Sequence, residues 1–206
     1  MELSLRWAQR SKNAHGDNTA ALFGIVQGGI DVNMRAESAR RTADLNFDGY
    51  GIGGLSVGET REQMIPALAA ALAHLPTDRP RYLMGVGDPA SLVEAVNLGV
   101  DQFDCVLQTR LGRHGTALTS AGRVNLKRLE FTLNEDPIDS ACACVVCGRH
   151  TRGYIRHLFQ VGEPTASRLV SIHNIAWTLN FMKTMREAIL GGRLGQFRQS
   201  TLSIWG

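Results

Sequence analysis

The sequence predicts an α/β protein with parallel strands. Short apolar stretches that end in glycine alternate with longer stretches of helical spacing, which is the pattern of successive βαβ units. The apolar stretches are continuous rather than alternating in polarity, as expected for strands covered on both faces. The 206 residues are 44% hydrophobic and 20% charged, which is the balance of an ordinary globular protein.

The elements of this fold are predicted in order along the first half of the chain. An opening helix is expected over 3–12, where Leu3 and Trp7 recur at helical spacing. In the helix that begins at 88, Asp88 is a suitable N-cap and Pro89 suits the first turn. The predicted strands are 22–29, 50–58, 82–87 and 100–107, and the helices between them are 31–45, 60–75 and 88–99.

The pattern changes after Thr119. Residues 120–147 are typical of short strands and loops that lead into a small insert. Helices are then expected over 151–159 and 163–190, and Gly191 follows the second one as a stop signal. The second helix carries an apolar stripe formed by Ile172, Ile175, Leu179, Met182 and Met185.

Two architectures fit this order of elements. One is an open doubly wound sheet and the other is part of a (β/α)₈ barrel. No G-x-G-x-x-G motif opens a helix, which disfavours the dinucleotide-binding version of the open sheet. A complete barrel needs eight strands and typically about 250 residues, so the strands of this chain would form half of one.

The composition also limits where the protein can be located in the cell and what it can bind. No apolar run is long enough to span a bilayer, and the N-terminus lacks the apolar core of a signal peptide. We therefore expect a cytoplasmic protein without membrane contact. The formal net charge of +3 permits a nucleic-acid partner without demanding one.

Three of the four cysteines lie in one C-x-C-x-x-C motif, Cys142, Cys144 and Cys147. In a cytosolic chain such a cluster favours a metal site over disulfides. Zinc takes four ligands in a tetrahedron, so one further ligand is needed, and the closed site that results would be structural. Spacing alone does not choose among the candidates, His150, His157 and His173.

Asp104 lies in the last predicted parallel strand, within GVDQFDCVLQTR. A carboxylate there is costly unless it is paired or used, and acids near the carboxyl ends of parallel strands are frequent catalytic residues. It could instead be held by backbone N–H groups or by Arg110. Asp101 points the other way and is the weaker candidate. Any anion bound by Arg110, Arg113 and His114 would lie beside Asp104.

Several stretches occur in an order typical of one enzyme family. They are LFGIVQGG, FDGYGIGGLSVGE, RYLMGVGDP, VDQFDCVLQTRLGRHG and CACVVCGRHTRGYIRHL, followed by IHN. Together they resemble the tRNA-guanine transglycosylases, also called queuine tRNA-ribosyltransferases, over nearly the whole chain. The resemblance implies the second half of a (β/α)₈ TIM barrel with an inserted zinc-binding subdomain. It divides the chain into the C-terminal half-barrel at 1–134, the zinc-binding subdomain at 135–173, and the last barrel helix and tail at 174–206.

The resemblance also implies a reaction in queuosine biosynthesis. Asp104 would attack the anomeric carbon of the wobble guanosine in a tRNA anticodon, expel guanine and hold the ribose covalently. An incoming deazaguanine would then release the modified tRNA, in a double displacement like that of a retaining glycosidase. Val57 stands where eukaryotic members tend to have glycine, which favours a bacterial-type enzyme that takes the prequeuosine base.

The site residues that the resemblance implies fall into three groups, and a homodimer is usual in the family. One structural zinc ion would be held by Cys142, Cys144, Cys147 and His173. Contacts to tRNA are assigned to Arg110, Arg113 and His114. The guanine pocket is assigned to Gln27, Tyr50, Gly53, Gly54, Leu55 and Met84.

The chain departs from the family pattern in several places. Gln108 replaces a proline, His114 replaces an asparagine, and Arg156 replaces a histidine. The aspartates that the family's first half-barrel supplies, including the general acid/base, have no counterpart here. We therefore expect an incomplete fragment, or a subunit completed by a separate N-terminal piece, that is inactive alone.

Three other functions fit some of the same residues. A non-catalytic, zinc-stabilised module could dock tRNA for another subunit. A barrel glycosidase acting on a nucleoside would need a second catalytic carboxylate, and none is evident at the predicted strand ends. An archaeosine-forming relative would differ in the base that it inserts.

Overall fold

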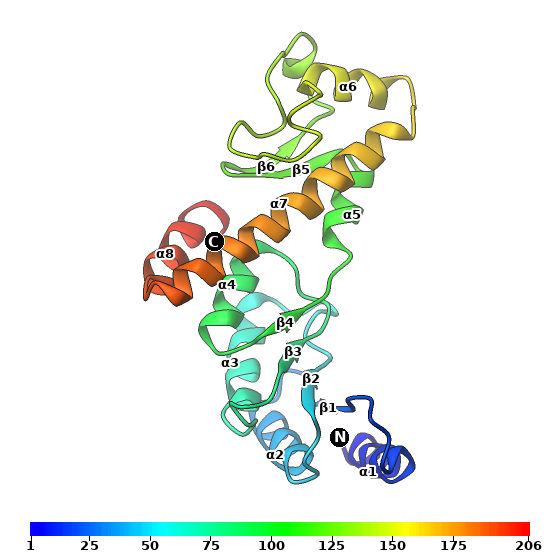
Figure 1. Ribbon diagram of the computed structural model, residues 1–206, viewed down its shortest axis with the longest axis vertical. Helices are drawn as coiled ribbons and strands as arrows, with labels where there is room; N and C mark the ends of the chain where they lie inside the picture. Colours follow the sequence, from blue (N-terminus) through cyan, green and yellow to red (C-terminus); the bar gives the residue numbers. More distant parts are fainter. The chain divides into compact units, whose positions relative to one another are not determined.

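A parallel sheet forms the first of two units into which the chain divides, Met1–Cys105 and Val106–Gly206 (Figure 1). The computed structural model describes all residues, 1–206. The four strands lie in chain order and each pairs in parallel with the next. They are β1 (Phe23–Val26), β2 (Gly49–Ile52), β3 (Arg81–Leu83) and β4 (Gln102–Phe103).

Helices connect these strands, as the sequence predicts. An opening helix, α1 (Glu2–His15), precedes β1, and the connections are α2 (Val32–Ala43), α3 (Arg61–Leu72) and α4 (Pro89–Asn97). Asp31 and Asp88 cap α2 and α4 by accepting the backbone N–H groups of Met34 and Ser91. A capping box of Thr60 and Gln63 begins α3.

The connecting helices cover one face of the sheet (Figure 1). Tyr50 and Ile52 of β2 point to that face and are fully buried in the main core. On the other face Ile25 of β1 is 44% exposed. A Cβ at Gly51 would lie 3.5 Å from the Met84 sulfur and 3.7 Å from Cγ1 of Ile25. The strands are thus covered by helices on one face, whereas the sequence predicts cover on both.

The second unit has an antiparallel hairpin and a long helix. The hairpin is formed by β5 (Thr116–Thr119) and β6 (Gly122–Asn125). A second core joins this hairpin to the segments that follow it, through Ala117, Leu126, Ile138, Val146, Ile155 and Val170. The helices are α5 (Leu107–Arg113), the 3₁₀ turn η1 (Leu129–Phe131), α6 (Arg152–Gln160), α7 (Thr165–Leu190) and α8 (Leu194–Trp205).

Two of these helices were not predicted, because each depends on packing against α7. Residues 107–113 were expected as a strand end and loop, but they form α5. A Cβ at Gly112 would lie 2.7 Å from the backbone nitrogen of Ser171, so glycine is what allows α5 to approach α7 so closely. In α8, Phe197 and Trp205 contact aromatic rings of α7.

The structure establishes an α/β fold with a parallel sheet, and it forms no closed barrel. The three-part division at 1–134, 135–173 and 174–206 stays a prediction about a completed barrel. None of the helices has both the length and the hydropathy needed to cross a membrane.

Gly24 gives a test of the packing between the sheet and its helices. We expect Gly24→Ala to lower the free energy of unfolding by about 1–3 kcal/mol, the usual cost of overpacking. The new Cβ would overlap the buried ring of Phe47 and lie 2.8 Å from Cγ2 of Thr42. Urea denaturation followed by circular dichroism measures the change. Gly51→Ala is the matched control, since its Cβ would make only ordinary contacts; equal losses in both variants would contradict the packing described.

Candidate functional site

Asp104 follows directly after β4, where the carboxyl ends of the parallel strands meet, and its side chain is exposed. The phenol of Tyr82 on β3 donates a hydrogen bond of 2.7 Å to Oδ1 of Asp104. The backbone N–H of Gly85 donates a second bond of 2.8 Å to the same oxygen. Because both bonds are accepted by Oδ1, Oδ2 is the oxygen that can act as a nucleophile.

These two hydrogen bonds also fix the charge of Asp104. The bond from Tyr82, and then the bond from Gly85, lower the pKa of Asp104 because both stabilise the carboxylate form. The same bond raises the pKa of Tyr82, so the phenol keeps its proton. The site therefore holds an ionised carboxylate in a fixed orientation. This is the chemical state that a nucleophilic carboxylate requires.

Tyr82 was missed in the sequence analysis, which considered backbone N–H groups or Arg110 as partners of Asp104. The strand register carries the signal that could have found it. Tyr82 pairs with Gln102, and Asp104 lies two residues after Gln102, just past the end of β4, where the alternation of side chains places it on the same side as Gln102. A tyrosine at that position is therefore a diagonal neighbour of the carboxylate.

Asp101 has a structural role in the same sheet. Its carboxylate accepts the backbone N–H of Arg81 at 2.8 Å and lies 3.6 Å from Nε of that arginine. These contacts hold the beginning of β4 against β3. Asp101 is thus engaged away from the candidate nucleophile.

Gln27 and two glycines lie close together just after the carboxyl ends of β1 and β2, and with Met84 they are called the slot below. A Cβ at Gly53 would lie 2.7 Å from Nε2 of Gln27, and a Cβ at Gly54 would lie 2.9 Å from Oε1. The Gln27 amide therefore lies on this backbone, and only glycine leaves room for it. Met84 contributes its sulfur beside Gly51. The role of these residues in binding a base stays a prediction.

Two of the residues assigned to the guanine pocket are placed differently. Tyr50 is fully buried, and its ring packs edge-on against Phe47 in the core between sheet and helices. It points to the opposite face of β2 from Gly51, because side chains alternate along a strand. The assignment of Tyr50 to the slot is therefore wrong in this structure. Leu55 is fully buried too, so neither its side chain nor its backbone is open to a ligand in this structure.

The basic residues assigned to tRNA binding lie at the end of α5, in the second unit. Arg110, Arg113 and His114 are all exposed, and their spacing of three and four places them on one helix face. Arg156, which departs from the family pattern, is buried. It donates hydrogen bonds to the carbonyl of Arg128 at 2.8 Å and to the side chain of Gln160 at 2.6 Å. The expectation that the α5 residues lie beside Asp104 stays a prediction.

A second candidate site is the Cys₃His cluster of Cys142, Cys144, Cys147 and His173. Its four ligand atoms all lie within 4.8 Å of one another. Nδ1 of His173 is 3.5 Å from the Cys144 sulfur and 3.3 Å from the Cys147 sulfur. Nε2 of His173 lies 2.8 Å from the carbonyl oxygen of Leu118; a proton on Nε2 leaves Nδ1 free to bind a metal.

The donor set fits a tetrahedral zinc ion with no open position. Burial raises the pKa of Cys147 to about 12, so a bound cation is what would keep this sulfur as a thiolate. The alternative ligand His150 instead stacks on Tyr154, with ring centroids 5.3 Å apart. The structure thus selects His173 from the histidines that spacing left open.

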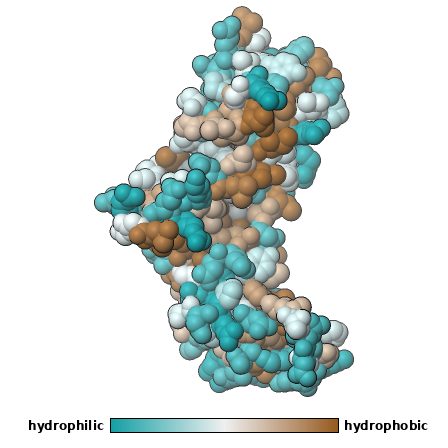
Figure 2. All heavy atoms as spheres, in the orientation of Figure 1, coloured by the Kyte–Doolittle hydropathy of each residue, from teal (hydrophilic) through white to brown (hydrophobic).

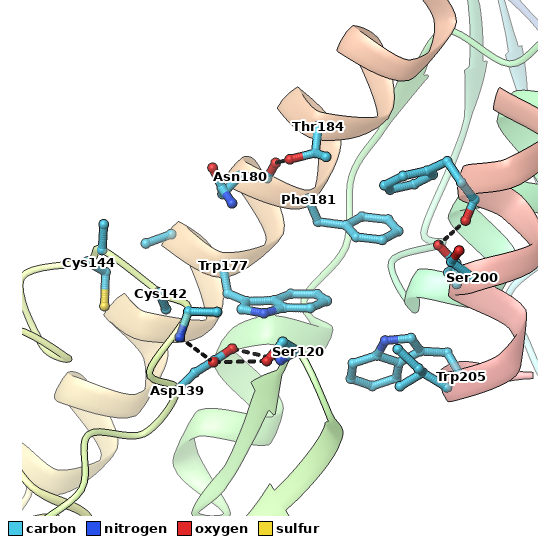
Figure 3. A pocket seen from close by; sticks show the side chains of 16 residues that line it. Ser120, Asp139, Cys142, Cys144, Trp177, Asn180, Phe181, Thr184, Ser200 and Trp205 are labelled. Atoms are coloured by element: carbon cyan, nitrogen blue, oxygen red, sulfur yellow. Dashed lines mark hydrogen bonds between the residues drawn. The ribbon is translucent and has the colours of Figure 1, made fainter. Parts of the chain in front are cut away.

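Two buried polar side chains, Asp139 and Asn174, form hydrogen bonds that fix the segments carrying the metal ligands. Asp139 accepts the backbone N–H of Ser120 at 2.7 Å, its hydroxyl at 3.0 Å and the N–H of Ala141 at 3.0 Å (Figure 3). Asn174, next to His173 on α7, binds three backbone groups of α5 and β5 at 2.9–3.0 Å. The metal loop is therefore tied to the hairpin and to α7.

An aromatic cavity lies beside this support, between α7 and α8 (Figure 3). Its volume is about 570 Å³, and it is lined by aromatic rings from both helices. Apolar side chains also gather along the outer surface of α7 (Figure 2), where Leu179 is 66% exposed. The rings are those of Trp177, Phe181, Phe197 and Trp205.

Comparison with known proteins decides the family. The family model described as queuine tRNA-ribosyltransferase matches residues 1–206. The chain belongs to this family. The queuine tRNA-ribosyltransferase of Francisella tularensis subsp. novicida is 47% identical over 203 residues, which cover 98% of this chain and 55% of that protein. The one of Hydrogenovibrio crunogenus is 49% identical over 197 residues, or 96% of this chain and 53% of that protein.

The chain spans about half the length of the curated relatives it matches. Family membership confirms the resemblance drawn from the sequence. It also agrees with the Cys₃His cluster as a metal site of a queuine tRNA-ribosyltransferase.

Removing the Tyr82 hydroxyl tests how the charge of Asp104 is controlled. In Tyr82→Phe the pKa of Asp104 should rise toward its ordinary value, because the largest stabilisation of the carboxylate is lost. The folded-state pKa lies below the unfolded value, so Asp104 stabilises the fold above its unfolded pKa and loses this effect as the pH falls. An NMR titration of the carboxyl carbon measures the shift. Tyr154→Phe is the control, and an unmoved pKa in Tyr82→Phe would contradict the assignment.

Metal analysis of the purified chain tests the cluster. We expect about one zinc ion per chain, as in closed structural sites. Cys144→Ser and His173→Ala should lose the ion and unfold at lower denaturant concentration, because binding energy contributes to folding. His150→Ala should keep it. Full zinc content in His173→Ala, or loss in His150→Ala, would show that the ligand set is wrong.

Proposed function

We propose that this chain carries the nucleophile of a tRNA-guanine transglycosylase, which exchanges the wobble guanine of a tRNA anticodon for a deazaguanine. Family membership supports the substrate class. The observation that carries the proposal is the exposed Asp104, which is ionised and held through Oδ1 by Tyr82 and Gly85. A carboxylate at the carboxyl end of a parallel sheet is well placed to meet a ligand.

The proposed reaction has two displacements. Oδ2 of Asp104 attacks C1′ of the guanosine ribose as the bond from C1′ to the base nitrogen breaks, and the electron pair leaves with guanine. Guanine takes a proton from a general acid, which we assign to the part of the relatives that this chain does not match. The incoming deazaguanine then loses a proton, attacks C1′ and displaces Asp104. Two inversions give net retention.

The slot supports a purine as leaving group and acceptor. We propose that the Gln27 amide reads the edge of the base, that the backbone at Gly53 and Gly54 binds it, and that Met84 packs on its ring. A purine reaches this depth only after the nucleotide has left its stack. The bulky Val57 favours the small prequeuosine base over queuine. Phosphates of the anticodon would bind Arg110, Arg113 and His114 through charge-assisted contacts.

We also propose the wider architecture and context of the complete enzyme. The four strands would be the second half of a (β/α)₈ barrel, and the exposed Ile25 would then face its interior. The zinc-binding subdomain would be 135–173, inserted before the last barrel helix, with the half-barrel at 1–134 and the tail at 174–206. The metal would be one structural Zn²⁺, the enzyme a cytoplasmic homodimer, and the chain alone inactive.

The rival function is a non-catalytic module that docks tRNA. Such a module needs the basic face of α5 and the metal cluster, but it has no use for an ionised carboxylate oriented by a phenol. A nucleoside glycosidase would need a second free carboxylate, and Asp101 is bound to Arg81. The prepared state of Asp104 therefore favours the transglycosylase.

Trapping of a covalent adduct tests the proposal. The chain is incubated with tRNA and radiolabelled guanine, with and without the complementary half of a Francisella relative, and adducts are located by mass spectrometry. We expect an adduct on Asp104, and label exchange only with the complementary half. Asp104→Asn should abolish both, by at least about 10³-fold for exchange, because the nucleophile is gone.

Asp101→Asn is the matched control, since that carboxylate lies in the same segment but is engaged by β3. It should leave the adduct in place. Binding of tRNA without any adduct would instead support the docking module. Exchange by the 206-residue chain alone would contradict the expected inactivity.

A further inference from the structure

The turn after β3 is held at two peptide groups by the two residues that follow β4. The N–H of Gly85 donates to Oδ1 of Asp104 at 2.8 Å. The carbonyl oxygen of the same glycine accepts a hydrogen bond from the Cys105 thiol, with 3.3 Å between sulfur and oxygen. Consecutive side chains beyond β4 thus bind both polar groups of one residue.

Gly85 is a residue that needs such support. Its φ of 80° lies in the left-handed region, which glycine adopts without strain. Glycine also has the least restricted backbone of all residues, so nothing in Gly85 itself keeps the turn in one conformation. A larger residue cannot replace it, because a Cβ would overlap the hydroxyl of Ser56 and lie 3.1 Å from the Cβ of that serine. The rigidity of the turn must therefore come from contacts with neighbouring groups.

The two contacts on Gly85 restrain different rotations. Its N–H belongs to the peptide group shared with Met84, and its carbonyl belongs to the peptide group shared with Val86. Because each peptide group is planar, orienting the first restrains φ and orienting the second restrains ψ. The bond to Asp104 alone would leave ψ free, and the Cys105 thiol supplies the second restraint. A thiol is a weak donor, but this one is half-buried, where water competes less for the carbonyl.

We propose that Cys105 is a positioning residue for the nucleophile: by holding the carbonyl of Gly85, it keeps the N–H of Gly85 on Oδ1 of Asp104. The thiol acts through Gly85 rather than on the ribose. Its effect reaches Oδ2 because the carboxylate keeps its orientation only while Oδ1 stays engaged. This inference rests on the proposed function, since it takes Asp104 to be the nucleophile.

The first experiment measures the Gly85 contact without any ligand. Amide hydrogen exchange of Gly85 and the carboxyl pKa of Asp104 are followed by NMR in the wild-type chain, Cys105→Ala and Cys105→Ser. In Cys105→Ala the Gly85 amide should exchange about threefold faster, which is the low end of the net effect of one hydrogen bond. The pKa of Asp104 should rise, because the Gly85 N–H stabilises its carboxylate second only to the Tyr82 phenol. The rise should be smaller than in Tyr82→Phe.

Cys105→Ser is the rescue variant, because a hydroxyl can donate to the same carbonyl. It should keep both values close to those of the wild type. Thr109→Val is the matched control, since the Thr109 hydroxyl is a nearby donor that binds the carbonyl of Val106 instead; both values should stay unchanged. Should Cys105→Ala fail to fold, Cys105→Val fills the space without a donor and takes its place. Unchanged exchange and pKa without the thiol, or a Cys105→Ser variant no better than Cys105→Ala, would overturn the proposal.

The second experiment connects the contact to the reaction. Exchange of radiolabelled guanine into tRNA is measured against pH, with the complementary half of a Francisella relative present. In Cys105→Ala the loss of activity on the acid side should begin at higher pH than in the wild type, because the nucleophile must be ionised. The kcat should fall by about tenfold with KM for tRNA unchanged, since a misplaced reacting group costs rate rather than binding.

Cys105→Ser should restore both the pH profile and kcat. A raised pKa of Asp104 in Cys105→Ala with an unchanged profile and kcat would overturn the role of Cys105 in the reaction. A wild-type mixture that exchanges no label contradicts the proposed function, whereas the NMR result still decides whether Cys105 positions Asp104.

Discussion

Parallel pairing of β3 with β4 is the constraint on which the candidate site depends. The register sets Tyr82 beside Gln102, and Asp104, two residues after Gln102, accepts a hydrogen bond of 2.7 Å from the phenol. The same pairing delivers the turn at Gly85, whose N–H completes the support. Asp101 reinforces the register from the other end of the strand by binding Arg81. Backbone geometry therefore prepares the carboxylate before any ligand arrives.

Much of this fold could be predicted from the sequence, because its signals are local. Asp88 with Pro89 marks a helix start, and apolar runs ending in glycine mark the parallel strands. Predictions of secondary structure were wrong where packing against a distant helix decides which element forms. Helix α5 forms because Gly112 allows close contact with α7.

Some residues of the candidate sites can likewise be predicted from the sequence, and others cannot. Asp104 and the three cysteines of the C-x-C-x-x-C motif stand out from residue type and spacing. Tyr82 does not, because its role depends on strand register. Tyr50 was assigned to the wrong face, since one position along a strand reverses the direction of the side chain. The choice of His173 over His150 came from family resemblance, and the structure supports it because α7 brings this distant histidine to the cysteine loop.

The adjacency of His173 and Asn174 on α7 has a consequence for helix α5 when the metal ion is scarce. Asn174 donates to the carbonyl oxygens of Gln108, in the first turn of α5, and of Thr116, just after α5. A shift of α7 after loss of the ion would therefore be transmitted to those anchors. Scarcity of the ion would then disturb the placement of α5 as well as the stability of the cysteine loop.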